Sequence, residues 1–202
     1  MNSRWFQLLV KRLVDIIFSI SVLLIFLPIW LLVAILIKLT SKGPVFFLQD
    51  RPGKNKEIFK VYKFRTMKPG SEAMLKGKEV LSDDDRVTTL GKILRRTKMD
   101  EIPQVLNIIK GDMSLVGPRP ERIASLEDYD DEISKRLNIR PGITGLAQVS
   151  GNIYINLIDR YRYDLYYVEH YSFFLDIKII IRTFLVVMLG EDRFKDNPLV
   201  KL

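Results

Sequence analysis

Residues 16–37 read IIFSISVLLIFLPIWLLVAILI, a run of 22 positions without one charged side chain. A straight helix of this length extends roughly 33 Å, which is enough to cross the hydrocarbon core of a bilayer. The run is longer than the apolar core of a signal peptide, and no small-residue cleavage pattern follows it. We therefore expect a helix that anchors the chain in a membrane.

Two features leave the path of this helix open. Basic residues flank both ends of the run, whereas a spanning helix collects Lys and Arg mainly on one side. They are Arg4, Lys11 and Arg12 before it, and Lys38 and Lys42 after it. Pro28 lies near the middle, where it removes a backbone hydrogen bond and kinks a helix. By these residues alone, a spanning helix and a re-entrant helix that returns to the same leaflet are equally acceptable.

The composition of the whole chain limits its chemistry. Its 202 residues suit one domain beside an anchor, and the absence of cysteine excludes disulfides and cysteine metal sites. The single histidine, His170, excludes a mechanism that needs two, and its aromatic neighbours favour packing over catalysis. The net charge of +8 attracts nucleic acid, anionic lipid headgroups or phosphorylated substrates, and composition does not separate these three.

A β-hairpin and several helices are expected after Gly43 and Pro44, which end the anchor. Short strands at 45–49 and 58–65 flank a turn at 51–55. The clearest helix covers 100–110, where apolar residues follow the i, i+3, i+4, i+7 rule and Gly111 closes the pattern. Further helices are expected at 121–138 and, amphipathic and strongly apolar, at 173–189. The second of these could lie flat at a membrane surface or pack in an ordinary core, and both alternatives are equally acceptable. Loops are expected at 68–85 (with some helix), 112–120 and 140–151.

An acidic pair, Asp100 and Glu101, stands at the predicted start of helix 100–110. As the N-cap or close to it, Asp100 would meet unpaired backbone N–H groups and the positive end of the helix dipole. Both favour the ionised carboxylate that a nucleophile requires, and the same helix end accepts a phosphate. Glu101 could bind a metal or transfer protons. An aspartate before a helix is more often only a cap, so spacing alone does not make this pair catalytic.

Basic residues in constrained loops accompany this pair. Arg95, Arg96 and Lys98 lie just upstream, and Arg119 lies between two prolines where a guanidinium could grip a phosphate. Arg140 precedes a loop whose Gly142 and Gly145 could expose N–H groups as an anion nest. Each loop alone is more often a structural turn, but three around one acidic helix start are less ordinary. The run Asp83–Asp85 has the look of an acidic metal motif, although such runs are usually solvated loops.

Several stretches, in this order, resemble the bacterial sugar transferases, which are small monotopic polyprenol-phosphate phosphoglycosyl transferases. They are YKFRTM at 62–67, DRVT at 85–88, DEIPQ at 100–104, GDMSLVGPRP at 111–120 and RPGITGLAQ at 140–148. The resemblance covers roughly residues 9–190. The chain looks like the minimal form, without the extra N-terminal membrane domain of larger members.

The resemblance implies a mechanism and a set of site residues. Asp100 would attack the phosphate nearest the sugar of a UDP-sugar, release UMP and form a covalent aspartyl-phosphosugar, from which polyprenol (undecaprenyl) phosphate takes the phosphosugar. Mg²⁺ is implied as cofactor, with Asp100 and Glu101 as its candidate ligands. The resemblance also assigns substrate binding to Lys63, Arg95, Arg119, Arg140, Gly142 and Gly145.

The resemblance also implies the architecture. We expect an α+β fold: a mostly helical membrane-associated domain with a re-entrant N-terminal helix broken at Pro28, a small β-hairpin and interfacial amphipathic helices. The family breaks this helix at a Ser-Pro pair, whereas Leu27 precedes the proline here. The expected divisions are an anchor at 1–42, a cytoplasmic interfacial catalytic domain at 43–190 and a polar tail at 191–202.

The expected location is the cytoplasmic face of the bacterial inner membrane, in a pathway such as exopolysaccharide or lipopolysaccharide biosynthesis. The expected partners are a UDP-sugar, polyprenol phosphate, membrane lipids and downstream glycosyltransferases, but no nucleic acid, because no nucleic-acid motif is present. The alternative is a non-catalytic, membrane-anchored polyanion-binding or scaffold protein, which would leave the acidic pair without a role. The identity of the sugar is not readable from these residues.

Overall fold

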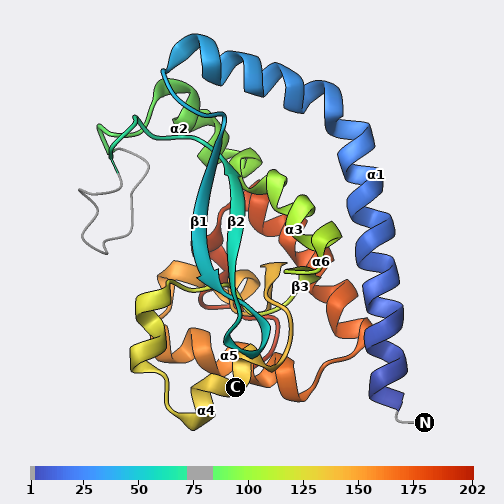
Figure 1. Ribbon diagram of the computed structural model, residues 1–202. Helices are drawn as coiled ribbons and strands as arrows, with labels where there is room; N and C mark the ends of the chain where they lie inside the picture. The colour runs from blue at the N-terminus through green and yellow to red at the C-terminus, as the bar shows by residue number, and fades with distance from the viewer. Residues whose placement is uncertain (1–2, 72–83) are drawn as a thin grey trace.

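The computed structural model describes residues 3–71 and 84–202, and within them the fold is mostly helical with two small two-stranded sheets (Figure 1). Its helices are α1 (Ser3–Thr40), α2 (Thr89–Arg96), α3 (Val105–Lys110), α4 (Asp131–Ser134), α5 (Leu157–Glu169) and α6 (Phe173–Leu189). The strands are β1 (Phe46–Pro52), β2 (Ile58–Phe64), β3 (Ser114–Val116) and β4 (Gly142–Thr144). The expected mostly helical fold with a small sheet is confirmed. Most of the expected loop 68–85, and Asp83 with it, lies outside the described residues.

α1 is one helix of 38 residues that bends sharply part-way along, so that two straight arms meet at an angle (Figure 1). Pro28 is the proline inside it and accounts for the bend, because a proline ring clashes with the preceding turn. The first arm is tied to the rest of the protein by charged groups. Lys11 Nζ lies 2.6 Å from Asp176 Oδ2, Arg12 donates to two carbonyls at the end of α3, and Asp15 accepts from Ser114 Oγ at 2.7 Å. Lys11 and Arg12 therefore bind groups of the protein itself. In the sequence they had been counted among the basic residues that flank the apolar run.

The second arm of α1 has one buried and one exposed face. Trp30, Val33 and Ile37, at helical spacing, pack against β2 and α2, and the Trp30 ring meets Phe64 edge-on with centroids 5.9 Å apart. The exposed side chains of this arm after the bend are apolar as far as Ile35, namely Ile29, Leu31, Leu32 and Ile35, and Lys38 is the first charged one. Trp5–Thr40 is, among the described residues, the one helix segment long and apolar enough to cross a membrane, and only 17% of its most apolar window is buried. A core helix of a soluble protein would be mostly buried, so this surface calls for another apolar environment.

The expected β-hairpin is confirmed. β1 and β2 pair antiparallel from Phe46 opposite Phe64 to Pro52 opposite Ile58. Gly53 N–H closes the connection by donating to the Glu57 carbonyl at 2.8 Å. β1 extends to residue 52, so Arg51 lies in the strand rather than in the turn expected at 51–55.

Four expected elements, two helices and two loops, differ from the structure. The helix at 100–110 begins as a 3₁₀ helix, η2 (Met99–Gln104), before α3 continues it. The helix expected at 121–138 is divided into η3 (Ile123–Asp128), α4 and η4 (Lys135–Asn138), because Tyr129 and Asp130 have extended backbone. The loops at 112–120 and 140–151 contain β3 and β4, which pair in parallel.

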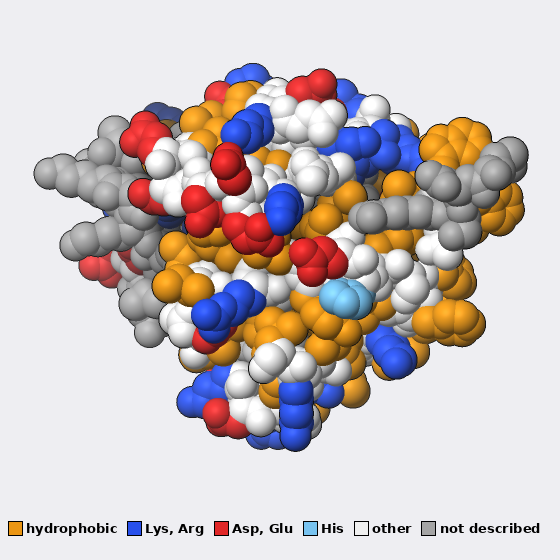
Figure 2. Space-filling view, turned by 90° about the horizontal axis from the view of Figure 1, so that it is seen from below, with side chains coloured by type: hydrophobic (Ala, Val, Ile, Leu, Met, Phe, Trp, Pro, Cys, Tyr) orange, Lys and Arg blue, Asp and Glu red, His pale blue; other side chains and the backbone are white. Residues whose placement is uncertain are grey.

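A second core lies between α5, α6 and the short sheet, with Ile179, Tyr167 and Val149 among its buried residues. Asn156 and Ser172 cap the first turns of α5 and α6, and α6 matches the helix expected at 173–189. Figure 2 shows the underside of the molecule, where acidic and basic side chains are interspersed with apolar ones and the sole histidine, pale blue, lies at the surface. His170 stacks on Tyr166 with ring centroids 4.1 Å apart, which agrees with packing rather than a catalytic position.

Candidate active site

A cleft of about 1260 Å³ opens between the hairpin, α2, η2 and the end of α6. Its described lining holds eleven Lys and Arg residues against five Asp and Glu residues, so its field is strongly positive. Its apolar lining includes Phe18 and Val22 from α1 and Val186 and Val187 from α6. One cleft therefore offers positive charge for a phosphate and apolar surface for a hydrocarbon.

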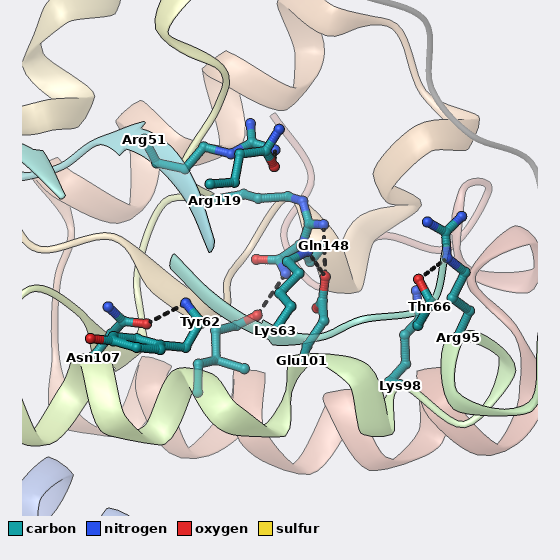
Figure 3. A network of polar contacts seen from close by, with 12 residues as sticks. Arg51, Tyr62, Lys63, Thr66, Arg95, Lys98, Glu101, Asn107, Arg119 and Gln148 are labelled. Carbon is teal, nitrogen blue, oxygen red and sulfur yellow. Dashed lines mark hydrogen bonds and ion pairs between the residues drawn. The ribbon is translucent and has the colours of Figure 1, made fainter. Parts of the chain in front are cut away.

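Glu101 is the centre of a charged cluster on this wall. Its Oε1 accepts from Lys63 Nζ at 2.7 Å and from Arg119 Nη2 at 3.2 Å, and Figure 3 shows both cations reaching the same carboxylate. Burial by itself raises the pKa of Glu101, but Lys63 and Arg119 outweigh it and hold the pKa well below its usual range. Glu101 therefore stays ionised, and Lys63 and Arg119 are held at the edge of the cleft.

Asp100 faces different surroundings. It is 8% exposed, and within 3–71 and 84–202 no group donates a hydrogen bond to its carboxylate. Burial raises the pKa of Asp100 to about 6, the charge of Glu101 adds to the shift, and Lys63, Arg95 and Lys98 oppose it. At neutral pH the group is mostly ionised but poorly solvated, which suits a nucleophile that attacks phosphorus.

The local backbone explains this position. Lys98, with φ of 56°, is the N-cap of η2, and no side chain caps this helix. Asp100 thus lies two residues inside the first turn and caps nothing, and its pKa moves opposite to the direction expected for a helix start. Met99 and Ile102, on either side of the pair, pack into the core under the second arm of α1 and keep the two carboxyl groups at the cleft.

Arg95 and Lys98 extend the positive surface past Asp100. Arg95 Nε donates to Thr66 Oγ1 at 2.9 Å, as drawn in Figure 3, and its charge acts on Asp100. Lys98 Nζ lies 2.8 Å from Glu191 Oε1. One cleft is thus lined by the two acids, Asp100 and Glu101, and by three cations. Lys63 belongs to β2, Arg95 to α2 and Arg119 to the loop after β3.

A sequence model of the family described as bacterial sugar transferase matches residues 6–190, which is nearly the whole chain. The chain belongs to this family.

The relatives of this sugar transferase are themselves named as sugar or sugar-phosphate transferases. It is 41% identical over 188 residues to a UDP-N-acetylgalactosamine-undecaprenyl-phosphate N-acetylgalactosaminephosphotransferase of Aeromonas hydrophila, covering 90% of this chain and 44% of that protein. It is 43% identical over 181 residues to a UDP-glucose:undecaprenyl-phosphate glucose-1-phosphate transferase of Klebsiella pneumoniae, covering 86% of this chain and 39% of that protein. The uncharacterized sugar transferase EpsL of Bacillus subtilis is 40% identical over 184 residues, which cover 90% of it. The chain therefore spans less than half of the two longer relatives.

Three predicted binding residues of the sugar transferase lie elsewhere. Arg140 Nε donates to the Gly111 carbonyl at 2.7 Å, at the end of α3, and Arg140, Gly142 and Gly145 do not line the cleft. Gly142 N–H donates to the Pro118 carbonyl at 2.9 Å, so this N–H is not free to bind an anion. A Cβ on Gly142 would lie 2.1 Å from Gly117 N, so glycine is needed because two backbones cross here. This loop supports the segment that carries Arg119.

Sequence reasoning missed two cleft residues of the sugar transferase. Arg51 was expected in a turn, yet β1 brings its guanidinium beside Arg119 (Figure 3). Gln148 Nε2 donates to the Ile143 carbonyl at 2.8 Å, and its buried Oε1 has no partner in the described part of the chain. Neither could be found from local pattern, because strand pairing and loop packing decide where both side chains point.

Proposed function

We propose that this chain is a phosphoglycosyl transferase that moves a phosphosugar from a UDP-sugar to polyprenol (undecaprenyl) phosphate. This step would initiate the assembly of a membrane glycoconjugate or polysaccharide, with downstream glycosyltransferases extending the product. One observation carries the proposal: Asp100, a buried carboxylate without a hydrogen-bond donor in the described residues, stands beside an ion-paired Glu101 in a basic cleft. The names of the relatives support the substrate classes.

In the first step an Asp100 carboxylate oxygen attacks the phosphorus nearest the sugar. A bond forms between that oxygen and phosphorus, the bond from phosphorus to the bridging oxygen breaks, and the electron pair leaves with UMP. Lys63 and Arg119, which Glu101 holds at the cleft, would neutralise charge that spreads over the phosphoryl oxygens. Arg95, whose charge interacts with that of Asp100, would contribute in the same way.

In the second step a phosphate oxygen of polyprenol phosphate attacks the same phosphorus. The bond between phosphorus and Asp100 breaks, its electrons return to the carboxylate, and the polyprenol diphosphosugar leaves. The apolar lining from α1 and α6 is suited to the first isoprene units. Two successive displacements predict ping-pong kinetics.

The residues present fit a role for Mg²⁺. Within residues 3–71 and 84–202 no group of three acidic or histidine side chains is assembled, so the protein supplies few ligands of its own. Mg²⁺ is commonly held by one or two carboxylates together with substrate phosphates and water. Asp100 and the second carboxylate oxygen of Glu101 would hold it, and the cation would then neutralise charge on the diphosphate.

The membrane placement belongs to the same proposal. The bend at Pro28 supports a re-entrant α1 whose second arm carries its exposed apolar face in the lipid. α6 exposes Phe174, Ile181, Phe184 and Met188, an arrangement suited to a helix lying in the interface. A cleft at the cytoplasmic surface of the inner membrane would meet a soluble UDP-sugar and a lipid-borne phosphate together.

The test is UMP release by the membrane-bound protein with Mg²⁺, polyprenol phosphate and a panel of UDP-sugars. We expect release with at least one sugar, a phosphosugar adduct on Asp100 with donor alone, and loss of both in Asp100→Asn. Asp50→Asn removes an acid from an exposed ion pair on the hairpin and is expected to keep full activity. Full turnover by Asp100→Asn, or salt-dependent DNA binding without any turnover, would contradict the proposal.

Loss of activity in Asp100→Asn will not reflect unfolding. The raised pKa means that ionisation of Asp100 destabilises the fold progressively as the pH rises from the unfolded pKa near 4, and the penalty is complete above about 6. Asparagine removes it, so we expect Asp100→Asn to be more stable than the wild type at pH 7, by about 3 kcal/mol. The two proteins should be nearly equal at pH 4, as measured by denaturant unfolding in detergent.

A further inference from the structure

Within residues 3–71 and 84–202, Arg51 forms no ion pair with a carboxylate. Its Nη2 donates to Gln49 Oε1 at 2.7 Å, a neutral partner on the same strand, and no other hydrogen bond or ion pair to its guanidinium is formed by the residues described. Arg119 and Lys63, by contrast, share Glu101, and Lys98 pairs with Glu191. Arg51 therefore has N–H donors to spare on the wall of the cleft.

The surroundings of Arg51 are unfavourable for a cation without an anion. Burial lowers the pKa of Arg51 to about 10, and the positive charges of Arg119 and Arg122 add to the effect. The carboxylates of Glu121 and Glu101 oppose the shift but do not cancel it. Figure 3 shows Arg51 and Arg119 extending alongside each other into the same region. Two guanidinium groups side by side, one of them without a carboxylate, are complementary to a phosphate.

The position of Arg51 relative to Asp100 indicates which of the two donor phosphates Arg51 contacts. In Figure 3 Glu101 lies between Arg51 on one side and Arg95 on the other. Lys63 and Arg95 are near enough to Asp100 for their charges to act on it, so Arg51 lies on the side of Glu101 away from the Arg95 end of the cleft. In an in-line displacement the leaving oxygen departs on the side opposite the nucleophile.

We propose that Arg51 binds the nucleotide phosphate of the donor, the one that leaves with UMP, and stabilises the charge that develops on it. This inference rests on the proposed function. It adds a residue for the first half-reaction alone, because the nucleotide phosphate is absent from the second. Gln49 would orient the guanidinium fork.

The test separates the two half-reactions. Arg51→Ala is expected to slow UMP release with donor alone about tenfold or more at low donor concentration and to weaken inhibition by UMP by a similar factor. Arg51→Lys keeps the charge without the fork and should lie between. Lys60→Ala removes the same charge from the same hairpin outside the cleft and should stay within about twofold of the wild type. Transfer from the preformed adduct to polyprenol phosphate should be unchanged in all of them.

Three results would overturn the inference: unaltered UMP release and UMP inhibition in Arg51→Ala, an equal loss in both half-reactions, or a loss confined to the polyprenol phosphate step. The last would assign Arg51 to the acceptor phosphate. If the wild type forms no adduct with any UDP-sugar, the proposed function fails, and calorimetric binding of UDP then tests Arg51 separately. Weaker binding of UDP by Arg51→Ala than by Lys60→Ala would support the anion site, and equal binding would overturn it.

Discussion

Adjacent carboxyl groups with opposite pKa shifts occupy one turn of chain at the cleft. Glu101 is ion-paired to Lys63 and Arg119 and stays charged at low pH, whereas burial brings the pKa of Asp100 to about 6. The difference arises from which side chain reaches the cations, because the two residues share a backbone segment. Such divergence within a pair is typical of sites that assign different roles to two acids.

The shift of Asp100 predicts the pH dependence of adduct formation. The nucleophile must be ionised, so the rate of UMP release with donor alone should rise with pH through about 6 and reach a plateau near 7. Glu101 titrates far below this range and adds no second step. The measurement is single-turnover UMP release between pH 5 and 8 without polyprenol phosphate, whose own ionisation would interfere. A rate that is flat across this range, or that falls as pH rises, would refute ionisation of Asp100 as the controlling step.

At the scale of elements, the loop that carries Arg119 is held from behind by a buried ion pair. Arg136 donates through Nε to Asp164 Oδ2 at 3.1 Å and through Nη2 to the Arg119 carbonyl at 2.9 Å. The Tyr161 ring covers its guanidinium, with the Arg136 Cζ 4.8 Å from the ring centroid. This pair joins α5, η4 and the loop after β3, so it positions Arg119 without reaching the cleft.

Removing one partner tests this support. Asp164→Asn leaves the Arg136 charge buried without compensation and should destabilise the protein by about 3–5 kcal/mol, with a lower affinity for the donor in the protein that remains folded. Glu132→Gln removes the acid of an exposed pair with Lys135 and should leave the unfolding curve unchanged. Denaturant unfolding in detergent and the donor concentration dependence of UMP release measure the two effects. An Asp164→Asn protein as stable as the wild type would show that the pair does not hold this loop.

Local patterns predicted elements better than contacts between elements. The apolar spacing at 100–110 and at 173–189 predicted helices because neighbouring turns of one segment suffice to define them. The pairing of β3 with β4 could not be predicted, since three-residue strands carry little pattern and their partner is distant in sequence. For the same reason Gly142 was read as an anion nest, while its actual constraint is the backbone of Gly117. The acidic pair was found by its spacing to basic loops, but its burial, and hence the raised pKa of Asp100, depends on how η2 packs against β2 and α2.

Across the whole molecule, the charged surface and the most apolar surface lie on different parts of the fold. The underside in Figure 2 carries charges of both signs, whereas the exposed residues of the second arm of α1 are apolar without exception from residue 29 to 35. The second arm also packs Trp30, Val33 and Ile37 onto the segment that carries Asp100 and Glu101. In the proposed re-entrant arrangement, membrane attachment and formation of the cleft would depend on the same bend. The domain boundary expected at residue 42 stays a prediction.

Replacing Pro28 should change the topology of the whole chain. Pro28→Ala restores a backbone N–H and removes the clash that bends α1, so the helix gains a straight form of roughly 57 Å that is long enough to span. The chain has no cysteine, so Ser3→Cys and Lys201→Cys each provide a single label site. With Pro28 present, a membrane-impermeant maleimide should label both positions from the cytoplasmic face, in inside-out vesicles and not in spheroplasts.

In the Pro28→Ala background we expect part of the Ser3→Cys label to appear in spheroplasts while Lys201→Cys stays cytoplasmic. Because a straight α1 withdraws Trp30, Val33 and Ile37 from the core beside the acidic pair, UMP release should fall in the same variant. Leu27→Ser is the matched control: the neighbouring side chain is exposed, the proline remains, and both labelling and activity should follow the wild type. If the two cysteines react from opposite faces of the membrane in the protein that keeps Pro28, α1 spans the membrane and the re-entrant proposal is wrong.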